Sequence, residues 1–262
     1  MLEYGSSLIT SVSWMKGSQF LAVGDSSGTL KLFDVERRTE VRSVCCHSDR
    51  ISSLAWNNCV LSSGSRDSNI LQHDMRTSRY FVKFTGHQQE VCGLRWSPDG
   101  RYLASGGNDN KLGVWELTSD SPVAMVSAHT AAVKALAWSP FKANCIATGG
   151  GTADKKIKVW DTFTMQCQSE VDTGSQVCAL LWNMHEQELL SAHGYSLNQL
   201  TLWRMPQMRK VNDFYGHTAR VLSMAQNPEG CCVVTASADE TLRFWRVFEG
   251  SKGDNPPSFC YR

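Results

Sequence analysis

The stretch from Gly86 to Glu116, GHQQEVCGLRWSPDGRYLASGGNDNKLGVWE, contains three short runs in which apolar and polar residues alternate. Ser-Pro-Asp-Gly at 97–100 and Gly-Asn-Asp-Asn at 107–110 separate the runs, and both sequences favour turns. Alternation with a period of two, interrupted by turn residues, indicates strands joined by hairpins. This stretch therefore predicts three β-strands, the last of which ends at Trp115.

The same pattern recurs along the chain and is marked by its nine tryptophans. One series ends the first run of each unit, at intervals of 42, 40, 42 and 44 residues: Trp14, Trp56, Trp96, Trp138 and Trp182. A second series ends the third run, at intervals of 45, 43 and 42: Trp115, Trp160, Trp203 and Trp245. Gln226 replaces the first kind of tryptophan once, and Phe33 and His73 replace the second kind. A period of about 40–45 residues is typical of WD40 repeats, so we expect an all-β propeller with six recognisable blades.

Composition excludes several classes of protein. The chain has 26 basic and 25 acidic residues, a net charge of +1, which does not favour nucleic acid as a partner. No apolar run reaches the length of a membrane helix, and none resembles a signal peptide. The ten cysteines form no Cys-x-x-Cys pair. Only His47, which follows Cys45-Cys46, and His193, which has no cysteine beside it, come near a cluster of metal ligands. We therefore expect reduced thiols in an intracellular protein, with no metal and no cofactor. Within strand-like runs we expect the cysteines to be small buried side chains: Cys92, Cys178, Cys231 and Cys232.

Histidine, serine or threonine, and aspartate recur at similar spacings before three tryptophans of the second series and before His73, which takes the tryptophan place in another unit. The sets are His87, Ser105, Asp109 and Trp115; His129, Thr148, Asp154 and Trp160; His217, Thr235, Asp239 and Trp245; and His47, Ser63 and Asp67 with His73. A single Ser-His-Asp set would suggest a hydrolase. Copies in several blades instead indicate buried side chains that satisfy one another, so we expect no enzyme.

If the repeated residues are structural, binding is expected where the repeats differ. One variable position lies six residues before each first-series residue: Leu8, Arg50, Glu90, Ala132, Gln176 and Arg220. The second variable set is the turn between the second and third strands: 66–68, 108–110, 151–152, 195–196 and 239–240. Both sets should emerge at the same end of a blade, around one mouth of the channel. They are polar and mixed in charge, which suits short polar peptides as ligands. For any single residue of these sets, a solvated loop surface is the alternative.

Several segments resemble the Fizzy/Fizzy-related family of cell-division-cycle WD40 proteins, which activate the anaphase-promoting complex. They include HQQEVCGLRW at 87–96, ASGGNDN at 104–110, ATGGGTAD at 147–154, DTGSQVC at 172–178 and DETLRFW at 239–245. The resemblance runs from about Ile9 to Phe248 and mixes features of both branches. It implies a propeller of seven blades, and we expect the first of these blades to be missing from this chain.

The resemblance also implies binding sites for degrons. Family residues for the Lys-Glu-Asn degron match Asn108, Asn110, Thr152, Gln176 and Arg220. In this reading Arg220 pairs with the degron glutamate, and the other four bind its amide and its lysine. The destruction-box site (Arg-x-x-Leu) would be incomplete, with Glu240 as the residue that takes the degron arginine.

The implied partners are the anaphase-promoting complex, degron-bearing cell-cycle substrates and spindle-checkpoint inhibitor proteins, in the nucleus and cytoplasm, with no membrane. We expect residues 1–10 to be the remnant of an outer strand, residues 11–248 the propeller repeats and residues 249–262 a disordered tail. Against the family pattern, we expect the N-terminal C-box that docks the ligase to be absent, and Cys260-Tyr261-Arg262 to replace the family's Ile-Arg tail. The alternative function is therefore a scaffold or decoy that binds peptides without activating the ligase. A fragment, a truncated gene product and a diverged paralogue all remain open, as does closure of a six-bladed ring.

Overall fold

The computed structural model describes residues 7–74, 77, 80–119 and 121–248, and every regular element in them is a β-strand. None of these residues belongs to a helix long and apolar enough to cross a membrane. The chain divides into two compact units, Met1–Val177 and Cys178–Arg262, which are treated separately below. The expected tail at 249–262, and residues 1–6 of the expected outer strand, lie outside the described residues.

The first unit contains four antiparallel sheets of four strands each, which we call blades one to four. Blade one comprises β1 (Ile9–Trp14), β2 (Phe20–Asp25), β3 (Thr29–Asp34) and β4 (Thr39–Cys45). Blade two comprises β5 (Ile51–Asn57), β6 (Val60–Ser65), β7 (Ile70–Asp74) and β8 (Tyr80–Phe84). Blade three comprises β9 (Val91–Trp96), β10 (Tyr102–Gly107), β11 (Leu112–Glu116) and β12 (Ala124–Val126). Blade four comprises β13 (Val133–Trp138), β14 (Cys145–Gly150), β15 (Lys156–Asp161) and β16 (Gln166–Asp172).

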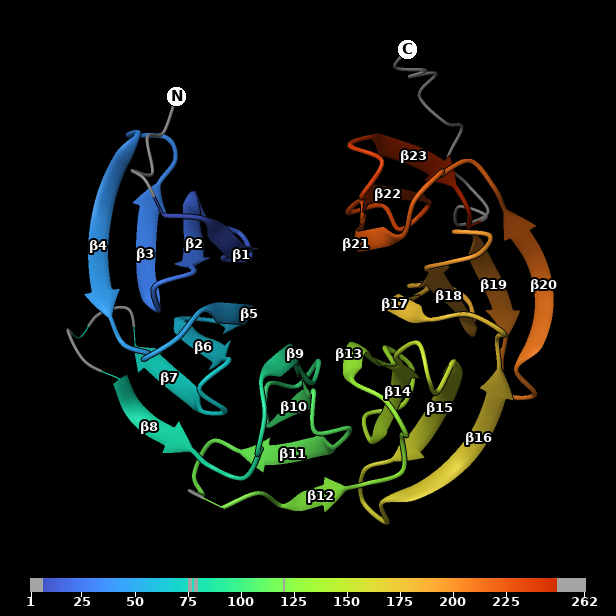
Figure 1. Cartoon of the computed structure of the whole chain (residues 1–262), viewed down its shortest axis with the longest axis horizontal. Helices are drawn as coiled ribbons and strands as arrows, with labels where there is room; N and C mark the ends of the chain where they lie inside the picture. The colour runs from blue at the N-terminus through green and yellow to red at the C-terminus, as the bar shows by residue number, and fades with distance from the viewer. Residues whose placement is uncertain (1–6, 75–76, 78–79, 120, 249–262) are drawn as a thin grey trace. The chain divides into compact units, whose positions relative to one another are not determined.

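Within this unit the blades stand side by side, with β1, β5, β9 and β13 on the inside and β4, β8, β12 and β16 on the outside (Figure 1). Indole groups of the inner strands tie each blade to the one before it. Trp56 Nε1 donates to the carbonyl oxygen of Ser13 over 3.0 Å, and Trp138 Nε1 donates to that of Arg95 over 2.9 Å. The first series of tryptophans therefore marks the contacts between consecutive blades.

Small residues in the second strands let the blades approach closely. A Cβ placed on Gly106, in β10, would lie 2.0 Å from the carbonyl oxygen of Val133 in the next blade. Apolar side chains from neighbouring blades fill the remaining space and form one buried cluster between blades two and three: Ala55, Ile70, Phe84, Val91, Leu94, Leu103 and Trp115. The core is thus a series of layers between sheets, which is the arrangement that repeat proteins use.

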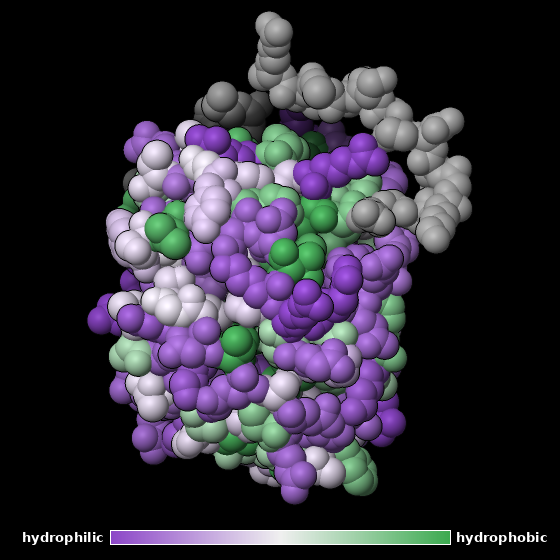
Figure 2. Space-filling view, turned by 90° about the vertical axis from the view of Figure 1, so that its right-hand side faces the viewer, coloured by the Kyte–Doolittle hydropathy of each residue, from purple (hydrophilic) through white to green (hydrophobic). Residues whose placement is uncertain are grey.

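The second unit contains blades five and six. Blade five comprises β17 (Val177–Trp182, whose first residue belongs to the first unit), β18 (Glu188–His193), β19 (Leu200–Arg204) and β20 (Arg209–Phe214). Blade six has three strands, β21 (Val221–Gln226), β22 (Cys232–Ser237) and β23 (Leu242–Arg246). A buried cluster joins the two blades and includes Leu202, Val221, Val233 and Phe248. The face in Figure 2 is mostly hydrophilic with scattered apolar residues, and most of outer strand β20 is exposed.

One face of blade one and one face of blade six carry exposed apolar side chains, and no described blade of the same unit packs on either face. In the first unit, Trp14 of β1 is 56% exposed, whereas the corresponding Trp138 is 8% exposed. In the second unit, Phe244 of β23 is 70% exposed, whereas the corresponding Leu202 of β19 is 6% exposed. Both faces carry apolar residues of the kind that other blades bury.

The predicted all-β propeller fold with six recognisable blades is confirmed, and each third strand ends one residue after the residue that marks it in the sequence. The sequence pattern showed three strands in each unit and missed the fourth, outer strands. Ile9 and Thr10 also differ from expectation, because they belong to the inner strand β1, where Ile9 pairs with Asp25 of β2. The structure therefore starts blade one two residues before the expected boundary.

Candidate peptide-binding surface

A chain of hydrogen bonds runs through blade three from the surface turn to the core. Trp115 Nε1 donates to Ser105 Oγ over 2.7 Å, and His87 Nε2 lies 2.7 Å from the same hydroxyl. The other imidazole nitrogen, Nδ1, lies 3.0 Å from Asp109 Oδ1. Each of these polar groups is satisfied by the next one, which confirms the predicted structural role.

Three other blades repeat this arrangement. In blade four, His129 lies 2.6 Å from Asp154 and 2.7 Å from Thr148, which accepts from Trp160 over 2.8 Å. The equivalent distances in blade six, for His217, Asp239, Thr235 and Trp245, are 2.8, 2.7 and 2.8 Å. In blade two, Ser63 Oγ lies 2.8 Å from Nε2 of both His47 and His73, and His47 Nδ1 lies 2.9 Å from Asp67.

Blade five builds the same chain in a way that the sequence analysis missed. Its histidine comes from strand β18 itself, where His193 Nε2 lies 2.7 Å from Ser191 Oγ, and Trp203 donates to that hydroxyl over 2.7 Å. Ser191 and His193 are two residues apart on one strand, so their side chains share a face. A serine two residues before a histidine was the available signal for this contact.

These chains are suited to stability and unsuited to nucleophilic catalysis. Ser105 is fully buried, and its oxygen is shared between an indole and an imidazole. Burial lowers the pKa of His87 and His129, although their aspartates oppose this effect. The imidazoles are therefore neutral at pH 7, with the proton on Nδ1 facing the carboxylate. A substrate carbonyl has no access to such a hydroxyl.

Blade two brings Cys46, His47 and His73 together, with one potential ligand atom from each within 4.8 Å of the others. Both imidazoles bind the Ser63 hydroxyl, and the Cys46 thiol contacts the carbonyl oxygen of Gly28 over 3.7 Å. Burial raises the pKa of Cys46 to about 12, which opposes the thiolate that a metal would need. The arrangement fits a hydrogen-bonded core better than an ion site.

The cysteines only partly follow expectation. Cys178 is buried, but Cys92, Cys231 and Cys232 are half-buried, so the prediction was wrong for these three. Burial nevertheless raises the pKa of Cys92 to about 12. The sulfur atoms of Cys231 and Cys232 lie 3.8 Å apart as free thiols. Cys231 lies in the turn before β22 and Cys232 is the first residue of that strand, so both lie at the end of the sheet and not in its buried middle.

The two variable sets do emerge side by side at the same end of individual blades. The backbone N–H of Asn108 donates to the carbonyl oxygen of Glu90 over 2.8 Å in blade three, and Arg66 donates to Arg50 over 3.0 Å in blade two. In blade six, Ala238 donates to Arg220 over 3.0 Å. In these three blades the residue before the inner strand is therefore tied to the turn between the second and third strands.

Four of the predicted degron residues lie in the first unit. Asn108 and Thr152 are exposed, and Asn110 and Gln176 are half-buried. Asn110 has a positive φ of 64°, and Ser68 and Lys155 adopt similar angles at the corresponding place after the turn aspartate. Asparagine tolerates this left-handed conformation, so the turn itself favours Asn110. In the second unit, Arg220 and Glu240 are both exposed on blade six, and Glu240 has a φ of 63°.

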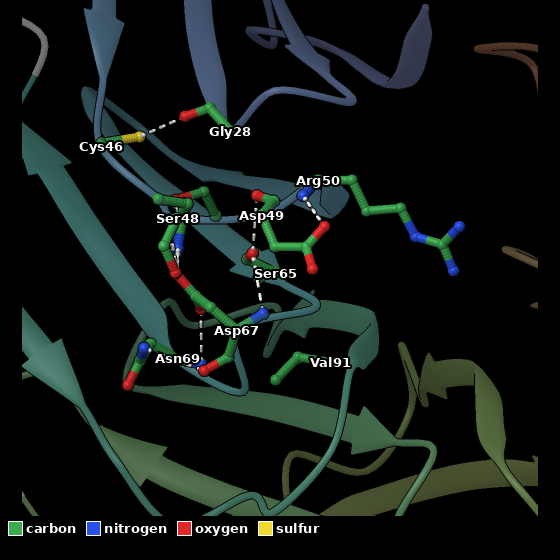
Figure 3. A network of polar contacts seen from close by, with 12 residues as sticks. Gly28, Cys46, Ser48, Asp49, Arg50, Ser65, Asp67, Asn69 and Val91 are labelled. Carbon is green, nitrogen blue, oxygen red and sulfur yellow. Dashed lines mark hydrogen bonds and ion pairs between the residues drawn. The ribbon is translucent and has the colours of Figure 1, made fainter.

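An ion pair between blades two and three was not predicted. Arg50 Nε lies 2.8 Å from Glu90 Oε1, and Arg50 NH2 lies 2.6 Å from Oε2. Figure 3 shows Arg50 beside the turn network of blade two, in which Ser65 donates to the Asp49 carbonyl over 3.0 Å and accepts from the Asp67 backbone over 3.1 Å. The side chain of Arg50 extends away from that network. An arginine and a glutamate at equivalent positions of consecutive units were the available signal.

The sequence of this chain matches a family model and several known proteins. The family model described as CDC20/Fizzy WD40 domain matches residues 1–245. The anaphase-promoting complex subunit cdc20 of Dictyostelium discoideum is 51% identical over 252 residues, covering 95% of this chain and 50% of that protein. The B-type cell cycle switch protein ccs52A of Medicago truncatula is 51% identical, and Protein FIZZY-RELATED 2 of Arabidopsis thaliana is 50% identical. Relatives from both branches therefore match about equally.

A solved structure agrees with the sequence comparison. A chain of the crystal structure of the mitotic checkpoint complex superimposes with a TM-score of 0.91 and 42% identity, covering 94% of this chain and 79% of that chain. The present chain spans about half the length of the curated relatives it matches. Blade repeats, turn residues and overall similarity lead to the same conclusion, and the chain belongs to the CDC20/Fizzy WD40 domain family.

Proposed function

We propose that this chain recognises Lys-Glu-Asn degron peptides and serves as the substrate-binding part of an activator of the anaphase-promoting complex. The observation that carries the proposal is the side-by-side placement of variable polar residues at one end of individual blades. Asn108 and Thr152 are exposed there on the turns of blades three and four. Exposed amide and hydroxyl groups on rigid turns suit a short polar peptide.

Each residue has a chemical role in this proposal. Arg220, exposed in the second unit, pairs with the peptide glutamate. Thr152, Gln176, Asn108 and Asn110 supply donors and acceptors for the asparagine carboxamide and the lysine ammonium. Glu240, exposed on blade six, accepts the arginine of a destruction box. No covalent step is required, so the chain acts by binding and is not itself an enzyme.

The names of the relatives indicate the partners. The Dictyostelium relative is named as a subunit of the anaphase-promoting complex, and the similar solved structure is a mitotic checkpoint complex. We propose that this protein engages the same ligase, its degron-bearing substrates and checkpoint inhibitor proteins, in the nucleus and cytoplasm. A chain that binds degrons but does not increase ubiquitination by the purified ligase would act instead as a scaffold or decoy.

The binding test is a titration of a Lys-Glu-Asn peptide against the wild type and Arg220→Ala. Loss of a charge-assisted contact costs about 1.5–3 kcal/mol, so the Kd should rise roughly 10- to 150-fold. Arg209→Ala is the matched control, because Arg209 is exposed on outer strand β20 of the same unit. Equal affinity of wild type and Arg220→Ala would refute the role of Arg220. A peptide with three alanines in place of Lys-Glu-Asn should not bind.

A further inference from the structure

Glu90 is a buried carboxylate at the end of the blades where peptide binding is proposed. Its side chain is 8% exposed, whereas that of its partner Arg50 is 46% exposed. The two residues precede the inner strands of blades two and three, and both oxygens of Glu90 accept from the guanidinium, at 2.8 and 2.6 Å. A paired arrangement of this kind fixes the plane and position of the carboxylate.

The ion pair also determines whether Glu90 donates or accepts hydrogen bonds with its other neighbours. Hydrogen bonds from Arg50 lower the pKa of Glu90, and the charges of Arg50 and Arg66 act in the same direction. An ionised carboxylate only accepts hydrogen bonds. Any amide group beside Glu90 must therefore turn its NH2 group, and not its oxygen, toward the carboxylate.

Asn108 is that neighbouring amide. Its Nδ2 lies 3.3 Å from Glu90 Oε2, and its backbone N–H donates to the Glu90 carbonyl oxygen over 2.8 Å. The backbone contact holds Asn108 beside Glu90, and the side-chain contact commits the NH2 group to the carboxylate. The Oδ1 atom of this exposed residue is then left to accept a hydrogen bond from a ligand.

We propose that Glu90 is a positioning residue, which turns the Asn108 carboxamide so that it accepts a hydrogen bond from a donor of the bound peptide. The donor is the lysine ammonium or the asparagine NH2 group of the degron. This inference rests on the proposed function, because it concerns the peptide bound at the same surface. It makes Glu90 and Arg50 determinants of specificity without contact between Glu90 and the peptide.

The substitution Glu90→Gln removes the proposed positioning of Asn108 while it nearly keeps the shape of the side chain at residue 90. A glutamine has nearly the same size, but its own NH2 group can donate to Asn108 Oδ1. The Asn108 carboxamide can then turn over, and its preference for a peptide donor is lost. Glu36→Gln removes the same charge at an exposed position of the same unit and serves as the control.

The experiment measures Kd for three peptides: Lys-Glu-Asn, its Lys→norleucine form and its Asn→Asp form. One of the two altered peptides lacks the group that donates to Asn108. In the wild type and in Glu36→Gln, that peptide should bind about five- to tenfold more weakly than Lys-Glu-Asn. In Glu90→Gln the same change should weaken binding by about twofold or less. The ratio of these effects cancels any general loss of affinity or stability, as in a double-mutant cycle.

A third background tests whether Asn108 transmits the effect. When Asn108 is already alanine, adding Glu90→Gln should no longer change how much either altered peptide weakens binding. If the ratio still changes there, Glu90 acts on the peptide directly and the positioning role is refuted. A second outcome is that the two altered peptides weaken binding equally in Glu90→Gln and in the wild type, while the wild type still binds Lys-Glu-Asn. The inference then fails, and the proposed function stands. If the wild type binds none of the three peptides, both fail together.

Discussion

Trp115 and Ser105 are joined by a hydrogen bond of 2.7 Å between the indole N–H and the hydroxyl oxygen, in the buried centre of blade three. The hydroxyl proton is then directed toward His87, and the imidazole Nδ1–H toward Asp109. A residue in the surface turn is thereby connected to the core. The stability of the blade depends on that connection at each step.

Asp109→Ala should destabilise the protein. The carboxylate accepts from His87 and, over 3.0 Å, from the backbone N–H of Gln88, so its removal leaves both donors without a partner. Donors that lose their partner in this way cost about 1–3 kcal/mol. Urea unfolding followed by tryptophan fluorescence measures the change. Glu36→Ala, an exposed loss of one negative charge, should change stability by less than about 0.5 kcal/mol. Equal unfolding midpoints for the two variants would contradict the assignment.

Stability should fall as the pH falls below about 6.5. Burial lowers the pKa of His47, His87 and His129 and lowers that of His73 to about 3. Below the ordinary histidine pKa the unfolded chain therefore binds more protons than the folded chain, and protonation favours unfolding. Asp67 adds to the loss near pH 4: burial raises its pKa, but hydrogen bonds from Asn69, His47 and Ser48 outweigh burial and lower it.

The substitution His73→Phe tests how much the protonation of His73 contributes to this pH dependence. Between pH 6 and pH 4 the wild type should lose more unfolding free energy than the variant, by up to about 1.4 kcal/mol per pH unit. Urea titrations at several pH values give both slopes. Parallel slopes for wild type and His73→Phe would show that His73 does not titrate differently in the folded and unfolded states.

The sequence predicted the repeated parts of this fold and missed the exposed ones. Most inner strands have a tryptophan as their last or penultimate residue, and most third strands have one as their penultimate residue, so their period was visible. Outer strand β16, Gln166–Asp172, reads QCQSEVD and is exposed along most of its length, so it carries little apolar alternation. It is fixed by pairing with β15, a contact that only the folded sheet supplies. Strand pairing at the edge of a blade therefore escaped the pattern analysis.

The candidate surface shows a similar division. The sequence indicated which positions vary and that they share one end of a blade, because the repeat register places equivalent residues at equivalent heights. It did not indicate that Arg50 and Glu90, forty residues apart, would pair across two blades. Nor did it show that His193 would replace the histidine found before the inner strand in other blades. Both features depend on contacts that the repeat pattern does not encode.

Gln72→Leu should change the unfolding free energy of the protein by less than about 1 kcal/mol, because a gain and a loss offset each other. Gln72 is fully buried, and its Nε2 atom has no hydrogen-bond partner among the described residues, although Oε1 accepts from Ser62 over 2.8 Å. The corresponding position in other blades is apolar: Leu32, Val114, Val159 and Leu202. Removal of the unsatisfied Nε2 donor favours the folded state, but the substitution also leaves the buried Ser62 hydroxyl without its acceptor, and each effect is worth about 1 kcal/mol. Gln72→Glu should destabilise strongly, because it buries a charge. Urea unfolding measures both variants, and a loss of more than about 2 kcal/mol for Gln72→Leu would show that Nε2 is satisfied in solution.

Leu202 and Phe244 occupy the same position in the third strands of blades five and six, but only Leu202 is covered. Leu202→Ala should therefore cost about 2–4 kcal/mol, because it leaves a cavity in a packed layer. Phe244→Ala removes a larger side chain from an uncovered face and should cost less than about 1 kcal/mol. Urea unfolding at low protein concentration measures both losses. A large loss for Phe244→Ala that grows with protein concentration would mean that a second molecule covers this face. A large loss independent of concentration would mean that the chain itself covers the face, contrary to the exposure of Phe244 in the structure.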